Sequence, residues 1–472
     1  LTPESQTRLG LKTHYGKLDD YTDAANKKRM DLGEAELAQM KRDFDYAKLS
    51  HASQLSYRLF ENQVVLGRTL YKYRWHQFTI STEGSVAGQL PVLLLNSHSI
   101  DDVSDAQAYV SRLNAVERVM NESADDLIDR ANRGFVAPAF AFKPVMDDAR
   151  QVITGAPFDS GPDAPVWADF KKKVGALKAD DATKAKLLAD GEAALKGPFK
   201  RGYDRFISAV AQVQPKATST DGVWRLPDGD AYDAAAGKFF TTTDLTPDQI
   251  HQTGLSEVAR IHAEMELIKA KVGFKGTLRA FLDYVKTDAK FHYPNTPEGK
   301  QQFLDDAKAI IANYMKTGAP QQFAVLPKNP LEVKAVEPWR EKTASVAFYN
   351  QGTPDGSKPG IYYVNLSDMT QVAKPQIEAT TCHEGAPGHH FQISRALEQQ
   401  DLPMFRRFAF YGAYAEGWGL YAEKLCKEAG GYVDPYADLG RLSLEVWRAT
   451  RLVVDTGIHA KHWSRDQAMQ YF

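Results

Sequence analysis

The sequence predicts a mainly α-helical protein of two lobes with one small β-hairpin. Over most of the chain, apolar residues recur every third or fourth position between charged ones, which is the period of amphipathic helices. Only two short runs, 345–349 and 361–365, are β-branched and aromatic, and a Gly- and Pro-rich segment joins them as in a hairpin. With 472 residues, the chain can bury a large core as one multi-lobed unit or as two domains.

The helical pattern begins near the N-terminus and is interrupted once. Ser104 and Asp105 are candidate caps for one of these helices, and Arg133-Gly134 closes it. Helices are predicted within 34–78 and over 104–132, 164–177, 182–195 and 246–271. The segment 214–244 is rich in Pro, Gly, Asp and Thr, which predicts a loop between the lobes. We therefore expect an N-terminal helical lobe over 1–235 and a second lobe over 236–472.

Composition and charge exclude several classes of protein. Hydrophobic residues make up 43% and charged residues 25% of the chain, which is typical of folded globular proteins. A formal net charge of -2 gives no field that would gather polyanions, so no nucleic-acid partner is expected. No apolar run approaches the roughly 20 residues that span a bilayer, so no transmembrane segment is expected.

Two features bear on the cellular compartment. The chain begins at Leu1, followed by polar residues, as in a mature protein whose leader has been removed, so export is expected. Cys382 and Cys426 could pair in an oxidising compartment. Two thiols in so long a chain are more often free and buried, and that is the expectation here.

Three of the 12 histidines lie within the segment His383-Glu-Gly-Ala-Pro-Gly-His-His390, next to Glu384. A catalytic zinc takes three protein ligands, usually imidazoles and a carboxylate, and leaves a position for water. A carboxylate nearby must then accept a proton from that water. The segment therefore predicts a zinc site with His383 as a ligand and Glu384 as the general base.

The spacing departs from the standard His-Glu-x-x-His motif, in which the two imidazoles share a helix face. Pro387 occupies the expected position, and the second histidine arrives two or three residues late. An uninterrupted helix would put His390 about 10 Å along the axis from His383, too far to share one ion. Pro387-Gly388 should therefore loop out. Either His389 or His390 is the second ligand, and the other contacts substrate or supports the site.

A third ligand is expected from another helix. Glu416 is flanked by Ala and Gly, and these small residues would let its helix approach a neighbour closely. Glu423 lies two turns further on the same face, with Lys427 four residues beyond it. That spacing predicts a solvated ion pair for Glu423. Glu416 is therefore the predicted ligand.

Two further groups of residues are candidates for binding a substrate or stabilising the oxyanion formed from it. Arg448, Arg451, Asp455 and His459 form one stripe on a predicted helix. If the stripe faces the site, His459 could stabilise the oxyanion, and Arg448 or Arg451 could hold a substrate carboxylate. On the second predicted strand, Tyr362, Tyr363 and Asn365 could line a cleft edge and pair with a substrate backbone. Aromatic core is the alternative for at least one of the tyrosines.

Three stretches resemble the bacterial domain-of-unknown-function 885 (DUF885) family, which is regarded as a family of zinc peptidases. They are the histidine segment extended by Phe-Gln, Glu416-Gly-Trp-Gly-Leu-Tyr-Ala-Glu423 and Arg451-Leu-Val-Val-Asp-Thr-Gly-Ile-His459. The resemblance implies a two-lobed helical metallopeptidase fold with a deep cleft, similar to angiotensin-converting enzyme and the oligopeptidases. Members are often exported or lipid-anchored. They usually continue past the point where this chain ends, so part of the C-terminal end is expected to be missing.

Together these observations predict a zinc-dependent hydrolase, most simply a metallopeptidase, whose C-terminal lobe is the catalytic one. Glu384 would take the proton of a zinc-activated water and pass it to the leaving amine. Two alternatives keep the metal: an amidase acting on a non-peptide substrate, and a non-catalytic metal-binding protein of the cell envelope. A serine hydrolase is disfavoured because the Gly-x-Ser-x-Gly motif is absent. The oligomeric state is not predicted.

Overall fold

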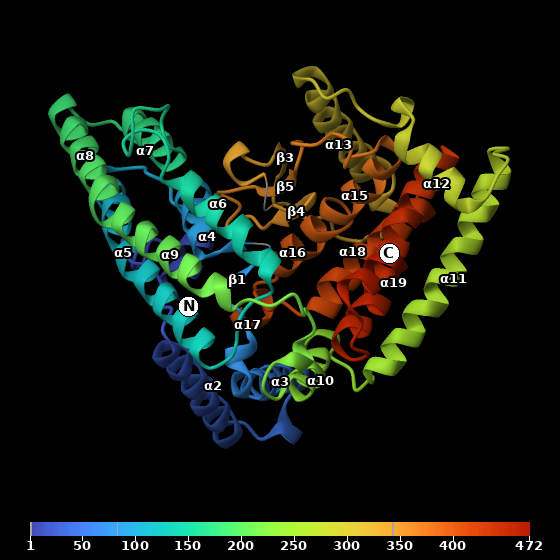
Figure 1. Ribbon diagram of the computed structural model, residues 1–472, viewed down its shortest axis with the longest axis horizontal. Helices are drawn as coiled ribbons and strands as arrows, with labels where there is room; N and C mark the ends of the chain where they lie inside the picture. The colour runs from blue at the N-terminus through green and yellow to red at the C-terminus, as the bar shows by residue number, and fades with distance from the viewer. Residues whose placement is uncertain (1, 83, 342–343) are drawn as a thin grey trace. The chain divides into compact units, whose positions relative to one another are not determined.

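The computed structural model describes residues 2–82, 84–341 and 344–472. It divides into two compact units, Leu1–Thr220 and Asp221–Phe472. Most of the described residues are helical, and the strands are few and short, so the predicted mainly α class is confirmed (Figure 1).

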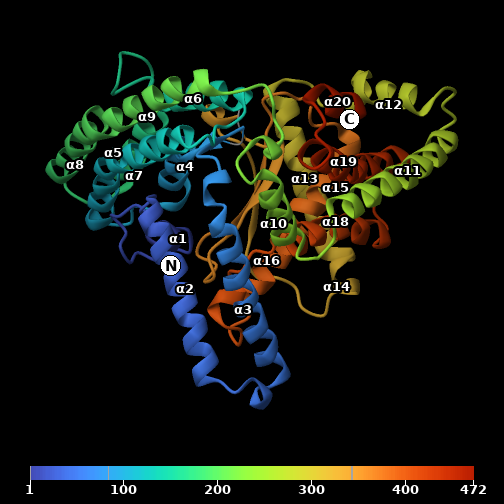
Figure 2. The same ribbon diagram turned by 60° about the horizontal axis from the view of Figure 1, so that its bottom comes forward.

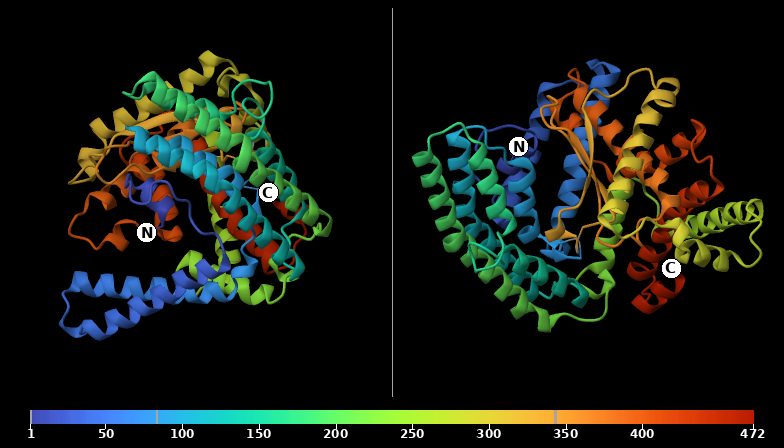
Figure 3. Two further views of the ribbon diagram at one scale, coloured as in Figure 1. Left: turned by 90° about the vertical axis from the view of Figure 1, so that its left-hand side faces the viewer. Right: turned by 90° about the horizontal axis from the view of Figure 1, so that it is seen from above.

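The first unit is built around α5 (Val103–Asn132), which packs along α9 (Lys200–Val213) and against α8 (Asp181–Ala194) (Figures 1 and 3). Its apolar positions recur at helical spacing, and residues such as Val116 of α5 and Phe206 of α9 are fully buried. Asp102 caps α5 by accepting the N–H of Asp105, so the cap lies just before the predicted candidates.

The remaining elements of the first unit surround this core. In this unit, α2 and α3 form an antiparallel pair (Figure 2), and α2 buries none of its described side chains. The other helices and the two paired strands are α1 (Pro3–Arg8), α2 (Asp23–Asp43), α3 (His51–Lys72), α4 (Val86–Val92), α6 (Phe142–Val152), α7 (Pro165–Ala176), β1 (Ile80–Ser81) and β2 (Gly84–Ser85).

The second unit contains a long helix pair, α11 (Pro247–Lys271) and α19 (Pro435–His459), which pack along each other (Figure 1). Thr246 and Gln249 form a reciprocal capping box at the start of α11, where the sequence predicts a helix start. The loop predicted over 214–244 is wrong in part, because α10 (Gly229–Thr241) lies within it. Gly and Asp at the start of α10 obscure a run of alanines, which are strong helix formers. The predicted lobe boundary at residue 235 falls inside this helix.

The other helices of the second unit include those that carry the candidate site. They are α12 (Leu278–Thr287), α13 (Pro297–Thr317), α14 (Ala319–Gln322), α15 (Ile377–Glu384), α16 (His389–Glu398), α17 (Met404–Arg407), α18 (Gly412–Glu428) and α20 (Arg465–Tyr471).

A three-stranded sheet of order β3-β5-β4 completes the second unit. β4 (Ala347–Asn350) pairs antiparallel with β5 (Gly360–Val364), which confirms the predicted hairpin. β3 (Leu331–Ala335) adds a parallel edge and was not predicted. Its sequence, Leu-Glu-Val-Lys-Ala, contains Glu, Lys and Ala, which are depleted in strands. Tyr362 of β5 packs with Phe303 of α13 in the core beneath the sheet.

In the part of the chain that the structure describes, no helix combines the length and the apolar character that a bilayer crossing requires.

Candidate metal centre

The histidine segment breaks a helix in two. α15 ends at Glu384 and α16 begins at His389, with the cis peptide Ala386–Pro387 between them. A Cβ atom on Gly388 would lie 1.8 Å from the carbonyl oxygen of His383, so only glycine fits this close return of the chain. The loop that Pro387 and Gly388 predict is therefore present, and it places His389 on the first turn of a new helix.

This break brings His389 back to His383, and α18 adds Glu416. The Nε2 atoms of His383 and His389 lie 3.6 Å and 3.8 Å from the two carboxylate oxygens of Glu416. One ligand atom from each of the three residues lies within 4.8 Å of the others. Both histidines are buried, whereas the Glu416 side chain is 60% exposed. The cluster therefore has the residue types and the spacing of a divalent-metal site.

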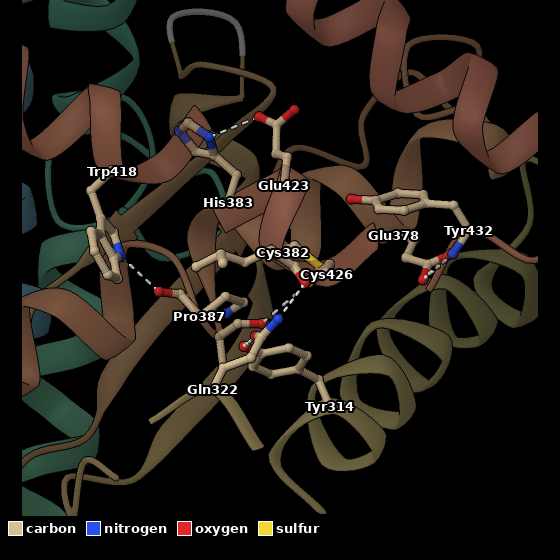
Figure 4. Close-up of a disulfide and its surroundings, with 12 residues drawn as sticks. Tyr314, Gln322, Glu378, Cys382, His383, Pro387, Trp418, Glu423, Cys426 and Tyr432 are labelled. Atoms are coloured by element: carbon tan, nitrogen blue, oxygen red, sulfur yellow. Dashed lines mark hydrogen bonds and ion pairs between the residues drawn. A yellow bond between two sulfur atoms is a disulfide. The ribbon is translucent and has the colours of Figure 1, made fainter. Parts of the chain in front are cut away.

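Glu423 supports the His383 ring from the opposite edge, which corrects its predicted role as a solvated ion pair. Its carboxylate is 1% exposed and accepts a hydrogen bond from Nδ1–H of His383 at 3.0 Å (Figure 4). Lys427 instead pairs with Asp438 at 2.8 Å. A donor at Nδ1 leaves Nε2 as the ring nitrogen that faces Glu416 and that can bind a metal once its own proton is displaced, which is how carboxylates orient metal-binding histidines.

Arg448 of α19 completes this support. Its Nη1 lies 3.0 Å from Oε1 of Glu423, and its Nη2 lies 3.0 Å from Nδ1 of His383. The prediction gave Arg448 a role in binding substrate. In the structure its guanidinium compensates the buried carboxylate of Glu423 and places a positive charge beside His383.

The pKa values of the two histidines in the cluster are shifted in opposite directions. Burial acts to lower the pKa of His383, but hydrogen bonds to Glu416 and Glu423 outweigh it and raise the pKa to about 9. Burial and the neighbouring His383 lower the pKa of His389 to about 4. The hydrogen bond from His383 lowers the pKa of Glu416. At neutral pH, His389 and Glu416 are therefore already in the forms that bind metals, and His383 holds one displaceable proton.

Glu384 lies directly after His383 at the end of α15. It is 8% exposed, and within the described chain its Oε2 atom has no hydrogen-bond partner. Burial raises its pKa to about 7, partly opposed by the charge of His383. A buried carboxylate with a free oxygen and a pKa near neutrality is suited to accept and return protons.

Gly419 of α18 provides the space for the His383 imidazole. A Cβ atom at this position would lie 2.5 Å from Cε1 and 2.7 Å from Nε2 of His383. The ring therefore rests directly against the backbone of α18, one turn from Glu416. The sequence indicates small residues around Glu416, but it does not indicate which of them the ring contacts.

We expect Gly419→Ala to weaken zinc binding at least tenfold, because the new methyl group must push the His383 ring away from Glu416. This is the lower end of the 10–100-fold range seen when residues that orient metal ligands are replaced. Competition titration of zinc against a chelator measures the change. Gly417→Ala is the matched control, since an added Cβ there meets no atom within 4 Å. Equal affinities for the two variants would contradict the role of Gly419.

A disulfide joins the two helices of the cluster, which corrects the expectation of free thiols. Cys382 of α15 and Cys426 of α18 are bonded, with their Cα atoms 6.5 Å apart (Figure 4). Trp418 of α18 adds a second tie by donating its indole N–H to the carbonyl of Pro387 at 2.7 Å. The pairing spans 44 residues of sequence and depends on the tertiary fold, so no local pattern reveals it.

His390 lies outside the cluster. Its Nδ1 atom is 3.1 Å from the hydroxyl of Tyr349 and 3.4 Å from that of Ser394. A hydrogen bond also joins its ring to the backbone of Asn329, and burial lowers its pKa to about 4. The sequence leaves open whether His389 or His390 is the second ligand. The structure places His389 next to His383 and Glu416, whereas His390 contacts Tyr349 of the sheet.

The other candidates on α19 have different partners. Arg451 is exposed, and its guanidinium lies 5.0 Å from the ring centre of Trp447. His459 accepts the backbone N–H of Val223 on Nδ1 at 3.1 Å. Within the described part of the chain, Arg448 is thus the one basic residue of the predicted stripe that contacts His383.

The three residues predicted to bind substrate lie on β5 or directly after it and make contacts within the protein. Tyr362 is fully buried. Tyr363 is 2% exposed and donates its hydroxyl to Glu337 at 3.2 Å. The side-chain amide of Asn365 donates to the carbonyls of Glu341 and Ala344. The burial of Tyr362 and Tyr363 fits the aromatic-core alternative for both tyrosines.

These features define a mainly helical protein with a cluster of two buried histidines and one exposed carboxylate that could hold a divalent metal. The chain belongs to the DUF885 family, described as bacterial protein of unknown function, whose model matches residues 3–472. The family expected from the sequence is therefore confirmed. No curated protein matches the chain.

Two solved structures are similar to the chain. One is a protein from Colwellia psychrerythraea described as a "putative lipoprotein"; it is 28% identical, with 99% of this chain and 82% of that chain covered and a TM-score of 0.90. The other, from Shewanella oneidensis and described as a "putative lipoprotein of unknown function", is 17% identical, with 99% and 85% covered and a TM-score of 0.62. The second likeness shows the fold alone.

Proposed function

We propose that this protein is a zinc-dependent hydrolase that cleaves peptides. The observation that carries the proposal is the convergence of His383, His389 and Glu416, with Glu384 directly after His383 and near enough for the charges of His383 and Glu416 to shift its pKa. Two imidazoles and one carboxylate are a recurrent ligand set of catalytic zinc, and three protein ligands leave one position for water.

The distances in the cluster fit a zinc ion. Ligand atoms about 2.1 Å from a tetrahedral zinc lie about 3.4 Å from one another. The separations from Glu416 to His383 and His389 are 3.6 Å and 3.8 Å. The Nδ1–H of His383 already donates to Glu423 at 3.0 Å. Small movements of the Glu416 side chain, which is 60% exposed, would bring its oxygens closer to both imidazoles.

The chain's own residues supply the acid–base chemistry. A zinc ion held by the three ligands would polarise water and a substrate carbonyl. Glu384 would take a proton from the attacking water on Oε2, the oxygen without a partner in the described chain, and return it to the leaving amine. The pKa of about 7 that burial gives Glu384 makes both transfers accessible near neutral pH.

The substrate class and the location are parts of the same proposal. The resemblance to zinc peptidases favours a peptide over a non-peptide amide, and a deep substrate cleft is expected with it. The Cys382–Cys426 disulfide favours an oxidising compartment, since such bonds are rare in the cytosol. The likeness to a "putative lipoprotein" points the same way. Both observations support a location in the periplasm or cell envelope, which is the location we propose.

Metal analysis and substrate digestion test the proposal together. We expect about one zinc per purified chain and none in His383→Ala. A digest of a peptide library, compared with simple amides, separates peptidase from amidase. Zinc in the wild type without cleavage of any substrate would instead favour a non-catalytic metal-binding protein of the envelope. Equal zinc content in the wild type and His383→Ala would reject the metal centre.

Zinc affinity should rise with pH. The two carboxylates raise the pKa of His383 to about 9, so below that pH a proton occupies the ring and zinc must displace it. Displacing one proton gives about a tenfold gain in affinity per pH unit, levelling off above pH ~9. Chelator-buffered zinc titrations between about pH 6.5 and 9.5 measure the slope. A flat profile would contradict the assignment of His383.

A further inference from the structure

We infer that the disulfide between Cys382 and Cys426 positions His383 for metal binding, so that the zinc site depends on oxidising conditions. The inference rests on the proposed function and adds a positioning group to it. Cys382 directly precedes His383, and Cys426 follows Glu423, the carboxylate that orients the His383 ring, by three residues. The covalent bond therefore links the backbone beside the ligand to the helix that carries its partners.

The helix that carries His383 has little stability of its own. α15 contains eight residues and stops at Glu384, where the chain turns through Gly385. Isolated helices shorter than about 12 residues are marginal in water, so tertiary contacts must hold α15 in place. The position of His383 is therefore set by the attachment of α15 to its neighbours.

Among those attachments, the disulfide acts on the helix backbone itself. The carboxylate of Glu423 and the guanidinium of Arg448 touch only the imidazole of His383, which could follow them by rotating. The bond of Trp418 to Pro387 holds the loop after α15. The disulfide fixes the Cα atom of residue 382 at 6.5 Å from that of residue 426.

The surroundings of the disulfide are apolar and tightly packed. Cys382 is 1% exposed and Cys426 3% exposed, and they share one core cluster with Ala379, Phe391 and Tyr432. Phe391 lies on α16, two residues after the second histidine of the cluster. A change in the separation of the two sulfur atoms would therefore displace both α15 and α16, the two helices that carry the imidazole ligands.

Reduction breaks this link. The S–S bond takes up two electrons and two protons and becomes two thiols. A phosphine reductant supplies the electrons and takes an oxygen atom from water to become the phosphine oxide. Two unbonded sulfur atoms must lie farther apart than two bonded ones, and because both side chains are buried in one packed cluster, we expect α15 to shift against α18 to make room. Metal ligands must be held within about 0.5 Å of their productive positions, so this shift weakens zinc binding.

Zinc titration of oxidised and reduced protein tests the inference. A phosphine serves as the reductant because thiols bind zinc. We expect reduction to weaken zinc binding at least tenfold, as when other groups that orient metal ligands are removed. The double variant Cys382→Ala/Cys426→Ala should bind weakly with or without the phosphine. If reduced wild type or the double variant binds zinc as tightly as oxidised wild type, the inference is overturned.

Two further measurements separate positioning from general loss of stability. Phe281→Leu is the destabilised control, because Phe281 is buried on α12, which packs on α11. This variant should keep the wild-type zinc affinity. The absorption spectrum of bound cobalt(II) should change on reduction of the wild type and stay unchanged in Phe281→Leu. The same loss of affinity in Phe281→Leu would show that the disulfide acts only through stability, which also overturns the inference.

Hydrogen exchange distinguishes failure of this inference from failure of the proposed function. Exchange of the amides of α15 should become faster on reduction, whether or not zinc is present. If the oxidised wild type binds no zinc, the proposed function fails. The amide exchange rate of α15 then still shows whether the disulfide positions this helix. If reduction leaves that rate unchanged, the positioning role of the disulfide is rejected.

Discussion

Glu384→Gln is expected to abolish turnover while zinc stays bound. Glutamine keeps the shape of the side chain, and His383, His389 and Glu416 are unchanged, so the proposed metal ligands remain. The amide cannot accept a proton, and general acid–base catalysis contributes about 10²–10⁴-fold to rate. We therefore expect kcat/KM on a cleaved peptide to fall by about that factor or more, with about one zinc per chain by metal analysis.

Glu378→Gln is the matched control for this experiment. Glu378 lies on the same short helix as Glu384, but its carboxylate accepts the backbone N–H of Tyr432 at 2.9 Å (Figure 4). The same chemical change there should leave turnover within about a few-fold of the wild type, because Glu378 supports a loop. If Glu384→Gln cleaves peptides at the wild-type rate, Glu384 is not the proton acceptor.

The sequence predicts much of the fold because most helices are amphipathic over many turns. The pattern over 104–132 matches α5 within one residue, since its apolar positions face a core that the same residues build. Short elements are not predicted in this way, because they contain too few residues to show a period. β3 offers only five residues, and α10 lies among Gly and Asp that otherwise favour turns. In both, tertiary packing outweighs weak local preference.

For the site, the sequence predicts the local chemistry and leaves the long-range geometry open. The interruption at Pro387 follows from the missing N–H and the size of the ring. The choice between the two adjacent histidines does not follow from spacing, because it depends on the dihedral angles of the loop before them. The support of His383 by Glu423 and the contact with Gly419 arise only when α15 meets α18.

One signal for Glu423 was present in the sequence. It follows Glu416 by seven residues, which places both carboxylates on one face of α18. The nearby Lys427 suggested a solvent-exposed pair, and only the burial of Glu423 at 1% excludes that interpretation. A second acid two turns from a candidate ligand is therefore a useful indication of an orienting carboxylate, provided that the helix face is buried.

His389→Ala should lower zinc affinity by more than 100-fold, whereas His390→Asn should lower it by less than tenfold. Loss of a direct ligand exceeds the 10–100-fold cost of losing a group that only orients ligands. Asparagine at residue 390 keeps a polar group near the Tyr349 hydroxyl, although the altered hydrogen bond is expected to destabilise the fold by about 1–3 kcal/mol. Chelator competition measures both affinities, and thermal unfolding measures the cost in stability.

The comparison is decisive because the two histidines are adjacent in sequence but have different partners. His389 lies 3.8 Å from Glu416, and its low pKa keeps the ring neutral at physiological pH. His390 is held by Tyr349 and the backbone of Asn329, so its ring would have to leave the sheet to reach the cluster. If His390→Asn lost zinc and His389→Ala kept it, the loop would adopt a different path when metal binds, and the assigned ligand set would be wrong.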